Sequence, residues 1–180
     1  MEPACSNFTV TGGIRFETLV PERVLIIPNQ DNIKNHVEFG IKVTNQTSTP
    51  YRFAFVSLVP EIVGPEGEAI QFDYAINSPK ATSASDCPLA KPGESLTFFT
   101  KAKFGCGRNK LGLGGQDLQG GSWSFAGLRP TRYWVRFTYK KLWSFRKLDF
   151  GRTPWPFSEE LWTGIAPTPY EEFSLKYPHS

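Results

Sequence analysis

The clearest structural signal in the chain is the ten-residue stretch Thr131-Arg132-Tyr133-Trp134-Val135-Arg136-Phe137-Thr138-Tyr139-Lys140. Apolar and aromatic side chains occupy every second position of this stretch, and most of the other positions are polar or basic. Because successive side chains of a β-strand point to opposite faces, this period of two predicts a strand with one face in the core and one in water. We expect the core face to carry Tyr133, Val135, Phe137 and Tyr139.

The same alternation recurs along much of the chain. Residues 36–45 alternate in the same way, and a turn cluster at 45–50 separates them from residues 51–59, where odd-numbered positions are mainly apolar. We expect these two segments to form an antiparallel pair. Further strands are expected at residues 14–16, 23–27, 95–104 and 171–177, with a short edge strand and a Pro-Glu-Gly turn within 60–70.

Three segments interrupt this pattern. Residues 105–121 hold seven glycines, which predicts a flexible Gly-rich loop. Residues 141–164 are rich in aromatic residues and proline and predict an insertion, with one helical turn after Ser158, which could cap it. Residues 72–92 lack a clean period, so we expect a surface loop there.

Short strands separated by turn signals, without a long helical pattern, favour an all-β fold. A chain of 180 residues with 39% hydrophobic composition is long and apolar enough to bury one sizeable core. We therefore expect a single domain over residues 1–180. Its predicted architecture is an antiparallel β-sandwich of about seven to nine strands with Greek-key connections. A closed barrel is the alternative.

Three turn motifs follow the order seen in immunoglobulin-like bacterial domains: Asn45-Gln46-Thr47, Lys91-Pro92-Gly93-Glu94-Ser95 and Leu128-Arg129-Pro130-Thr131-Arg132-Tyr133. The region around residues 35–140 most resembles the intracellular proteinase-inhibitor-type domain of bacilli. The resemblance implies an immunoglobulin-like sandwich, with a tyrosine corner in which the Tyr133 hydroxyl bonds a backbone group just upstream. It implies no inhibitory residue, and residues 105–121 and 141–164 have no counterpart in it.

Side chains that carry chemistry are few. The two histidines, His36 and His179, offer little scope for a nucleophile and its base, and no metal-ligand spacing or phosphate-binding Gly-Lys-Ser/Thr motif occurs. We therefore expect no enzyme activity and no catalytic, cofactor-binding or metal-binding residues. Cys5, Cys87 and Cys106 are expected to be reduced thiols, with a disulfide between the last two as the alternative.

The sequence also bears on the location of the protein. No run of about 18 apolar residues occurs, so we expect no membrane span. The start Met1-Glu2-Pro3-Ala4-Cys5 lacks the basic and apolar regions of a secretory signal, which predicts a cytoplasmic protein. Asn7-Phe8-Thr9 and Asn45-Gln46-Thr47 match glycosylation acceptors, but without a secretory signal we give them little weight.

Charge is distributed unevenly. Residues 1–90 carry six basic against ten acidic residues, whereas residues 91–180 carry fourteen against seven. Within 101–152 twelve basic residues and only two acidic ones are interleaved with tryptophans, as binding of single-stranded nucleic acid or an anionic surface would require. The candidate electrostatic contacts are Arg132, Trp134, Arg136 and Lys140. The same residues also suit the solvated face of an ordinary strand.

The leading functional hypothesis is a non-enzymatic protein-interaction or structural module that presents loops and an edge strand to a protein partner. The segment 141–162 holds too many large aromatic side chains to leave exposed, so they either cover the core as a lid or contact another chain. We expect a partner contact there, formed by Trp143, Phe145, Trp155, Phe157 and Trp162. Electrostatic binding of single-stranded nucleic acid or an anionic surface through the basic, aromatic region 101–152 is the alternative.

Overall fold

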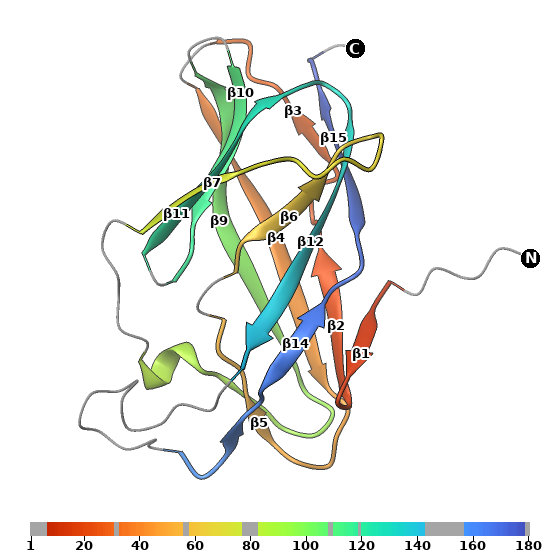
Figure 1. Cartoon of the computed structure of the whole chain (residues 1–180), viewed down its shortest axis with the longest axis vertical. Coiled ribbons are helices and arrows are strands. Elements are labelled where there is room, and N and C mark those ends of the chain that lie inside the picture. The colour runs from red at the N-terminus through yellow and green to blue at the C-terminus, as the bar shows by residue number, and fades with distance from the viewer. Residues whose placement is uncertain are drawn as a thin grey trace, which may run out of the picture.

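The structure is a computed structural model that describes residues 7–30, 33–55, 58–76, 83–107, 110–118, 120–142 and 157–178. Within these ranges the chain forms fifteen strands and one short 3-10 helix, η1 (Ala84–Asp86). The fold is therefore all-β, as expected. The strand number exceeds the seven to nine predicted because several strands are only two to four residues long. Two sheets account for most of them (Figure 1).

The larger sheet has seven strands, and every neighbouring pair in it is antiparallel. Its most extensive pairing joins β4 to β9 over eleven partners, from Lys34 opposite Gly105 to Thr44 opposite Ser95. Across the sheet the order is β1 (Thr9–Thr11), β2 (Ile14–Leu19), β4 (Lys34–Asn45), β9 (Ser95–Gly107), β10 (Lys110–Gln116), β11 (Gly121–Leu128) and β7 (Asp73–Ile76).

The second sheet is built around β12 (Arg132–Lys141), which pairs antiparallel with three strands: β6 (Pro60–Val63), β14 (Gly164–Pro167) and β15 (Glu171–Lys176). The strand β3 (Val24–Ile26) joins β15 in parallel. A small third sheet contains β13 (Glu160–Leu161), β5 (Tyr51–Arg52) and β8 (Leu89–Ala90). Figure 1 shows β6, β12 and β14 in front of the long strands of the larger sheet.

Buried aromatic side chains of the two large sheets contact each other and form the core. The ring centroids of Phe39 and Phe173 are 5.0 Å apart, and those of Phe16 and Tyr139 are 5.7 Å apart. Such tilted aromatic pairs contribute about 1 kcal/mol each beyond the area they bury. The predicted inner face of residues 131–140 is confirmed, since its four alternating side chains are all at most 3% exposed.

The turn that leads into β12 is a tyrosine corner. The Tyr133 hydroxyl accepts a hydrogen bond from the Arg129 N–H at 2.9 Å and lies 3.2 Å from the Arg129 carbonyl, to which it donates. The hydroxyl is therefore satisfied by one residue four positions upstream. This bonding confirms the corner that the resemblance implied.

Replacing Tyr133 by phenylalanine should lower the free energy of unfolding by about 1.5 kcal/mol, because it leaves the Arg129 backbone groups unpaired while it keeps the buried ring. Urea denaturation followed by tryptophan fluorescence measures this loss. Tyr170→Phe is the matched control: that ring is 39% exposed and keeps its place under the Arg136 guanidinium. Equal losses in the two variants would contradict the role of the corner.

One sequence prediction about strand pairing is wrong. Residues 36–45 and 51–59 do not pair with each other where they are described: β4 lies between β2 and β9, and among the described residues of the second segment only Tyr51 and Arg52 form a strand. Phe53 and Phe55 alternate because both side chains enter the core between β5 of the small third sheet and β6 of the second sheet, and they are at most 3% exposed. Residues 60–70 do contain the expected strand and turn, with Gly67 at φ +81°.

The described residues of the Gly-rich segment 105–121 lie mostly in strands, where a flexible loop was expected. Much of it forms β10, a strand inside the larger sheet with β9 on one side and β11 on the other. A Cβ on Gly115 would lie 2.6 Å from Cζ2 of Trp123, an indole that is 2% exposed. Glycine here makes room for a bulky neighbour, which is the reason that it is tolerated inside a strand.

The remaining irregular segments also contain strands. Residues 72–92, expected to be a loop, include β7, η1 and β8. No helix follows Ser158: the structure places β13 at Glu160–Leu161 instead, paired in parallel with β5. These strands are two to four residues long and carry too few side chains to show a period.

Candidate partner-binding groove

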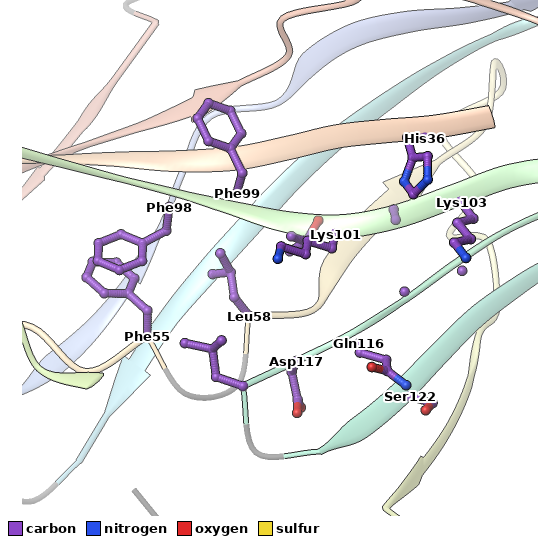
Figure 2. A pocket seen from close by; sticks show the side chains of 15 residues that line it. His36, Phe55, Leu58, Phe98, Phe99, Lys101, Lys103, Gln116, Asp117 and Ser122 are labelled. Carbon is purple, nitrogen blue, oxygen red and sulfur yellow. The ribbon is translucent and has the colours of Figure 1, made fainter. Parts of the chain in front are cut away.

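A cavity lies where β10 ends before β9 does. The two strands pair only as far as Lys101 opposite Gln116, so residues 95–100 of β9 extend past the end of β10. No described strand pairs with this part of β9 on the side away from β4. A cavity of about 680 Å³ occupies this edge, which we call the β9 groove (Figure 2). It is lined by residues of β9, the end of β10, the segment around Phe55 and Leu58, and His36 of β4.

The backbone along the groove is oriented by the pairing further along β9. Lys101 directs its carbonyl toward β10, since a Cβ on Gly115 would lie 2.8 Å from that oxygen. Polar backbone groups of an antiparallel strand alternate between its two edges, residue by residue. The N–H and C=O groups of Phe99 and Thr97 therefore point to the same side as those of Lys101, into the groove.

The inner wall of the groove is apolar. The rings of Phe55 and Phe98 stack, with their centroids 3.4 Å apart and their planes 19° apart. Leu58 is buried beside them, and Figure 2 shows its side chain between this pair and Lys101. Phe55 also contacts Tyr139 of β12 edge-on at 5.5 Å, so the wall is anchored to the second sheet. Of the stacked pair, Phe55 is buried and Phe98 is half-buried.

The outer wall is basic and carries one exposed aromatic ring. Lys103 stands opposite His36 on β4, and Lys101 stands opposite Glu38. Phe99, two residues before Lys101, is 42% exposed on the same face. An aromatic ring among basic side chains on a solvated strand face offers both an apolar contact and attraction for negative charge.

The tip of the β10–β11 hairpin closes one end of the groove. Asp117 accepts hydrogen bonds there from the Tyr74 hydroxyl at 2.7 Å and from the Gly121 N–H at 2.8 Å. The bond to Asp117, more than burial, raises the pKa of Tyr74 to about 12. This carboxylate therefore holds the hairpin to β7.

The predicted electrostatic contacts lie elsewhere, on the outer face of the second sheet. Arg136 is 2.8 Å from Glu61 and lies over the ring of Tyr170 at 4.6 Å. Arg132 lies 4.0 Å from Glu172. Trp134 is half-buried and Lys140 is exposed on the same strand. The described part of the basic region 101–152 is therefore divided between two sheets, and its arginines on β12 face acidic neighbours.

The predicted aromatic contacts also separate. Trp143, Phe145 and Trp155 lie outside the described residues. Phe157 is half-buried, with the Arg52 guanidinium 3.4 Å above its ring.

For Trp162 the structure corrects the prediction of a partner contact. Its side chain is 6% exposed and stacks on Phe53, with the ring centroids 6.1 Å apart. This tryptophan is a core residue.

The described residues offer little reactive chemistry. They contain no group of three or more His, Cys, Asp or Glu side chains placed to hold a metal ion. Cys87 and Cys106 are free thiols. Burial, assisted by the negative charge of Asp86, raises the pKa of Cys87 to about 11, so its reactive thiolate form is scarce at neutral pH.

Sequence reasoning did not find the β9 groove, because its residues come from segments far apart in the chain. One signal was present: Phe99 has the same parity as Lys101 and Lys103, so it is an aromatic residue on the polar face of a strand.

Comparison with known proteins found no matching family model, no similar curated protein and no similar solved structure. In the described part of the chain, no helix has the length and apolar character needed to cross a membrane.

Proposed function

We propose that this protein is a non-enzymatic protein-interaction module, built on an immunoglobulin-like β-sandwich, that binds its partner in the β9 groove. The observation that carries the proposal is the open edge of β9, which runs past the end of β10 between an apolar and a basic wall. An exposed sheet edge with pockets beside it is one of the recurring ways in which protein domains recognise extended segments.

Several features support the immunoglobulin-like topology. Consecutive strands β2 and β3 belong to different large sheets, so the chain changes sheet near Pro21. The last strand, β15, pairs antiparallel with β12 and parallel with β3. Together with β4 beside β9 in one sheet and β6 beside β12 in the other, this order supports the proposal of a Greek-key sandwich.

The composition of the groove favours binding over catalysis. Its ionisable lining consists of His36, two lysines and Asp117, and the last of these is held by Tyr74 and Gly121. No nucleophile lies beside a base in this lining, as covalent catalysis would need. Its apolar wall and open backbone suit a peptide segment.

A second candidate function is binding of single-stranded nucleic acid. The exposed ring of Phe99 next to Lys101 and Lys103 favours it, because base stacking and phosphate pairing use such side chains. Nucleic-acid binding depends steeply on salt through counterion release, whereas apolar contacts and backbone hydrogen bonds do not. Salt dependence therefore separates the two candidates.

A photo-crosslinking amino acid in place of Phe99 tests the proposal, with the same amino acid in place of Ile165 as a control. Both side chains are exposed, 42% and 50%, but Ile165 lies in the second sheet. The variants are irradiated in native lysate at low salt and at about 0.3 M salt, with and without nuclease. We expect a discrete protein adduct from position 99 at both salts and none from position 165. Adducts that vanish with salt or nuclease, or that form equally at both positions, would contradict the proposal.

A further inference from the structure

We infer that the β9 groove takes an extended peptide that adds to β9 as an antiparallel strand, with acidic side chains alternating with apolar ones. This inference rests on the proposed function and names the class of partner that the groove accepts. Three observations carry it: the direction of the free backbone groups, the difference between the two walls, and the charge of the outer one.

The backbone of β9 fixes where the peptide lies. Thr97 and Phe99 direct their N–H and C=O groups into the groove, on the same edge to which β10 is bonded further along. An added strand therefore continues the line of β10. Antiparallel pairing is the geometry of β10 on this edge, and it forms two hydrogen bonds with each residue opposite Thr97 and Phe99.

The two walls then determine which side chains the peptide presents. Residues directly opposite each other on paired strands point to the same face. Peptide residues opposite Leu96 and Phe98 therefore point inward, toward the apolar wall that Phe55 and Leu58 complete. Residues opposite Thr97 and Phe99 point outward. This arrangement requires apolar residues at every second position.

Charge selects the outward positions. A peptide side chain opposite Phe99 is the diagonal neighbour of Lys101, a distance that long side chains span. Lys103 extends the basic surface on the far side of Lys101, and Glu38, the cross-strand neighbour of Lys101, lies on β4, on the side of β9 away from the peptide. Glutamate at the outward positions is attracted to this wall, and lysine is repelled.

The length of the site is also defined. Only the six residues Ser95–Thr100 extend past the last β9–β10 partner pair. At about 3.4 Å per residue an added strand of six residues covers this edge, and beyond it the peptide meets Gln116 and the hairpin tip. A heptapeptide is therefore sufficient as a probe.

The test uses the full-length protein and a capped, fluorescent heptapeptide of alternating glutamate and valine, with binding measured by fluorescence anisotropy. In the antiparallel register the glutamate N–H groups face β9 and the valine N–H groups face away. N-methylation of three backbone amides of one kind thus provides a matched pair of probes. We expect methylation at glutamate to weaken binding more than tenfold, and methylation at valine to change it by less than threefold.

Protein variants test the two halves of the site separately. Lys101→Glu should weaken binding about tenfold, whereas Lys140→Glu, an exposed lysine on β12, should have no effect. The N–H of Thr97 faces the groove and not β4. Thr97→Pro therefore removes a hydrogen-bond donor for the peptide and leaves the bonds between β9 and β4 in place, so it should abolish binding while the fold is kept. If this variant does not fold, hydrogen exchange in the native protein takes its place, and peptide should protect the amides of Thr97 and Phe99.

The outcomes separate this inference from the proposed function. Three results would overturn the proposal that an acidic peptide adds to β9 as an antiparallel strand. They are no binding of the alternating peptide, equal effects of the two methylation patterns, and a stronger loss of binding on methylation at valine. A protein adduct from position 99 in the crosslinking experiment would then keep the groove as a binding site for a partner of another shape. Failure of both experiments overturns the groove itself.

Discussion

Replacing Asn45 by alanine is expected to lower the free energy of unfolding by about 3 kcal/mol, because four hydrogen bonds of a fully buried amide are lost. The side-chain nitrogen donates to the carbonyls of Thr49 and Ala90 at 2.8 and 2.9 Å. The side-chain oxygen accepts from the N–H and the hydroxyl of Thr47 at 3.0 and 2.7 Å. Without Asn45 the buried Ala90 carbonyl loses its side-chain donor, and the half-buried Thr47 loses the acceptor of its N–H.

The backbone of Asn45 adds to this role. Its N–H donates to the Glu94 carbonyl at 2.9 Å, and its carbonyl accepts from the Gly93 N–H at 2.7 Å. Two of the three turn motifs recognised in the sequence therefore meet at one residue. Loss of the Asn45 side chain loosens both turns at this end of the larger sheet.

Urea denaturation followed by tryptophan fluorescence measures the effect, with Asn35→Ala as the control. Asn35 also bonds a backbone carbonyl, that of Ile26 at 3.2 Å, but it is exposed, so its loss should cost at most about 0.5 kcal/mol. Similar losses in the two variants would show that the Asn45 network contributes little.

Trp162→Ala should lower the free energy of unfolding by about 4 kcal/mol, the usual cost of removing a large buried aromatic side chain. The indole contacts Phe16 and Tyr139 at ring-centroid distances of 5.3 and 5.2 Å, in addition to its stacking on Phe53. The Tyr139 hydroxyl also donates to the Trp162 carbonyl at 3.2 Å. Burial raises the pKa of Tyr139, so this hydroxyl keeps its proton.

Circular dichroism in the far ultraviolet suits this measurement, since the mutation removes a fluorophore. Phe99→Ala is the control because it truncates an aromatic ring that is 42% exposed, and it should cost less than about 1 kcal/mol. A Trp162 variant as stable as the control would return this residue to the list of candidate partner contacts.

Long strands with one buried face could be predicted from the sequence. Residues 131–140, 36–45 and 95–104 each repeat the period of two over about ten positions, and they correspond to β12, β4 and β9. In each of these strands alternate residues face the core and the solvent and are apolar and polar in turn. A run of about ten residues is long enough to show this alternation. The tyrosine corner was predictable because its turn motif and its hydroxyl lie close together in the chain.

The sequence predictions that were wrong or missing, for residues 51–59, for β10 and for the β9 groove, have physical reasons. Phe53 and Phe55 alternate because the chain passes through the core between sheets, which leaves the same pattern as a strand. In β10 the glycines respond to close neighbours, above all the Trp123 indole over Gly115, and a single sequence does not show which neighbour will be there. The β9 groove escaped prediction because it depends on where β10 ends relative to β9, a matter of register.

The buried side chain of Asn45 has a consequence for how this protein can be produced. Asn45-Gln46-Thr47 is an acceptor for N-linked sugar, and a chain entering a secretory compartment presents it before folding, while the amide is accessible. A sugar on that nitrogen removes one of its two N–H groups and cannot enter a site with no exposed surface. A host that glycosylates proteins would thus trap part of the secreted material unfolded, and expression without glycosylation avoids this loss.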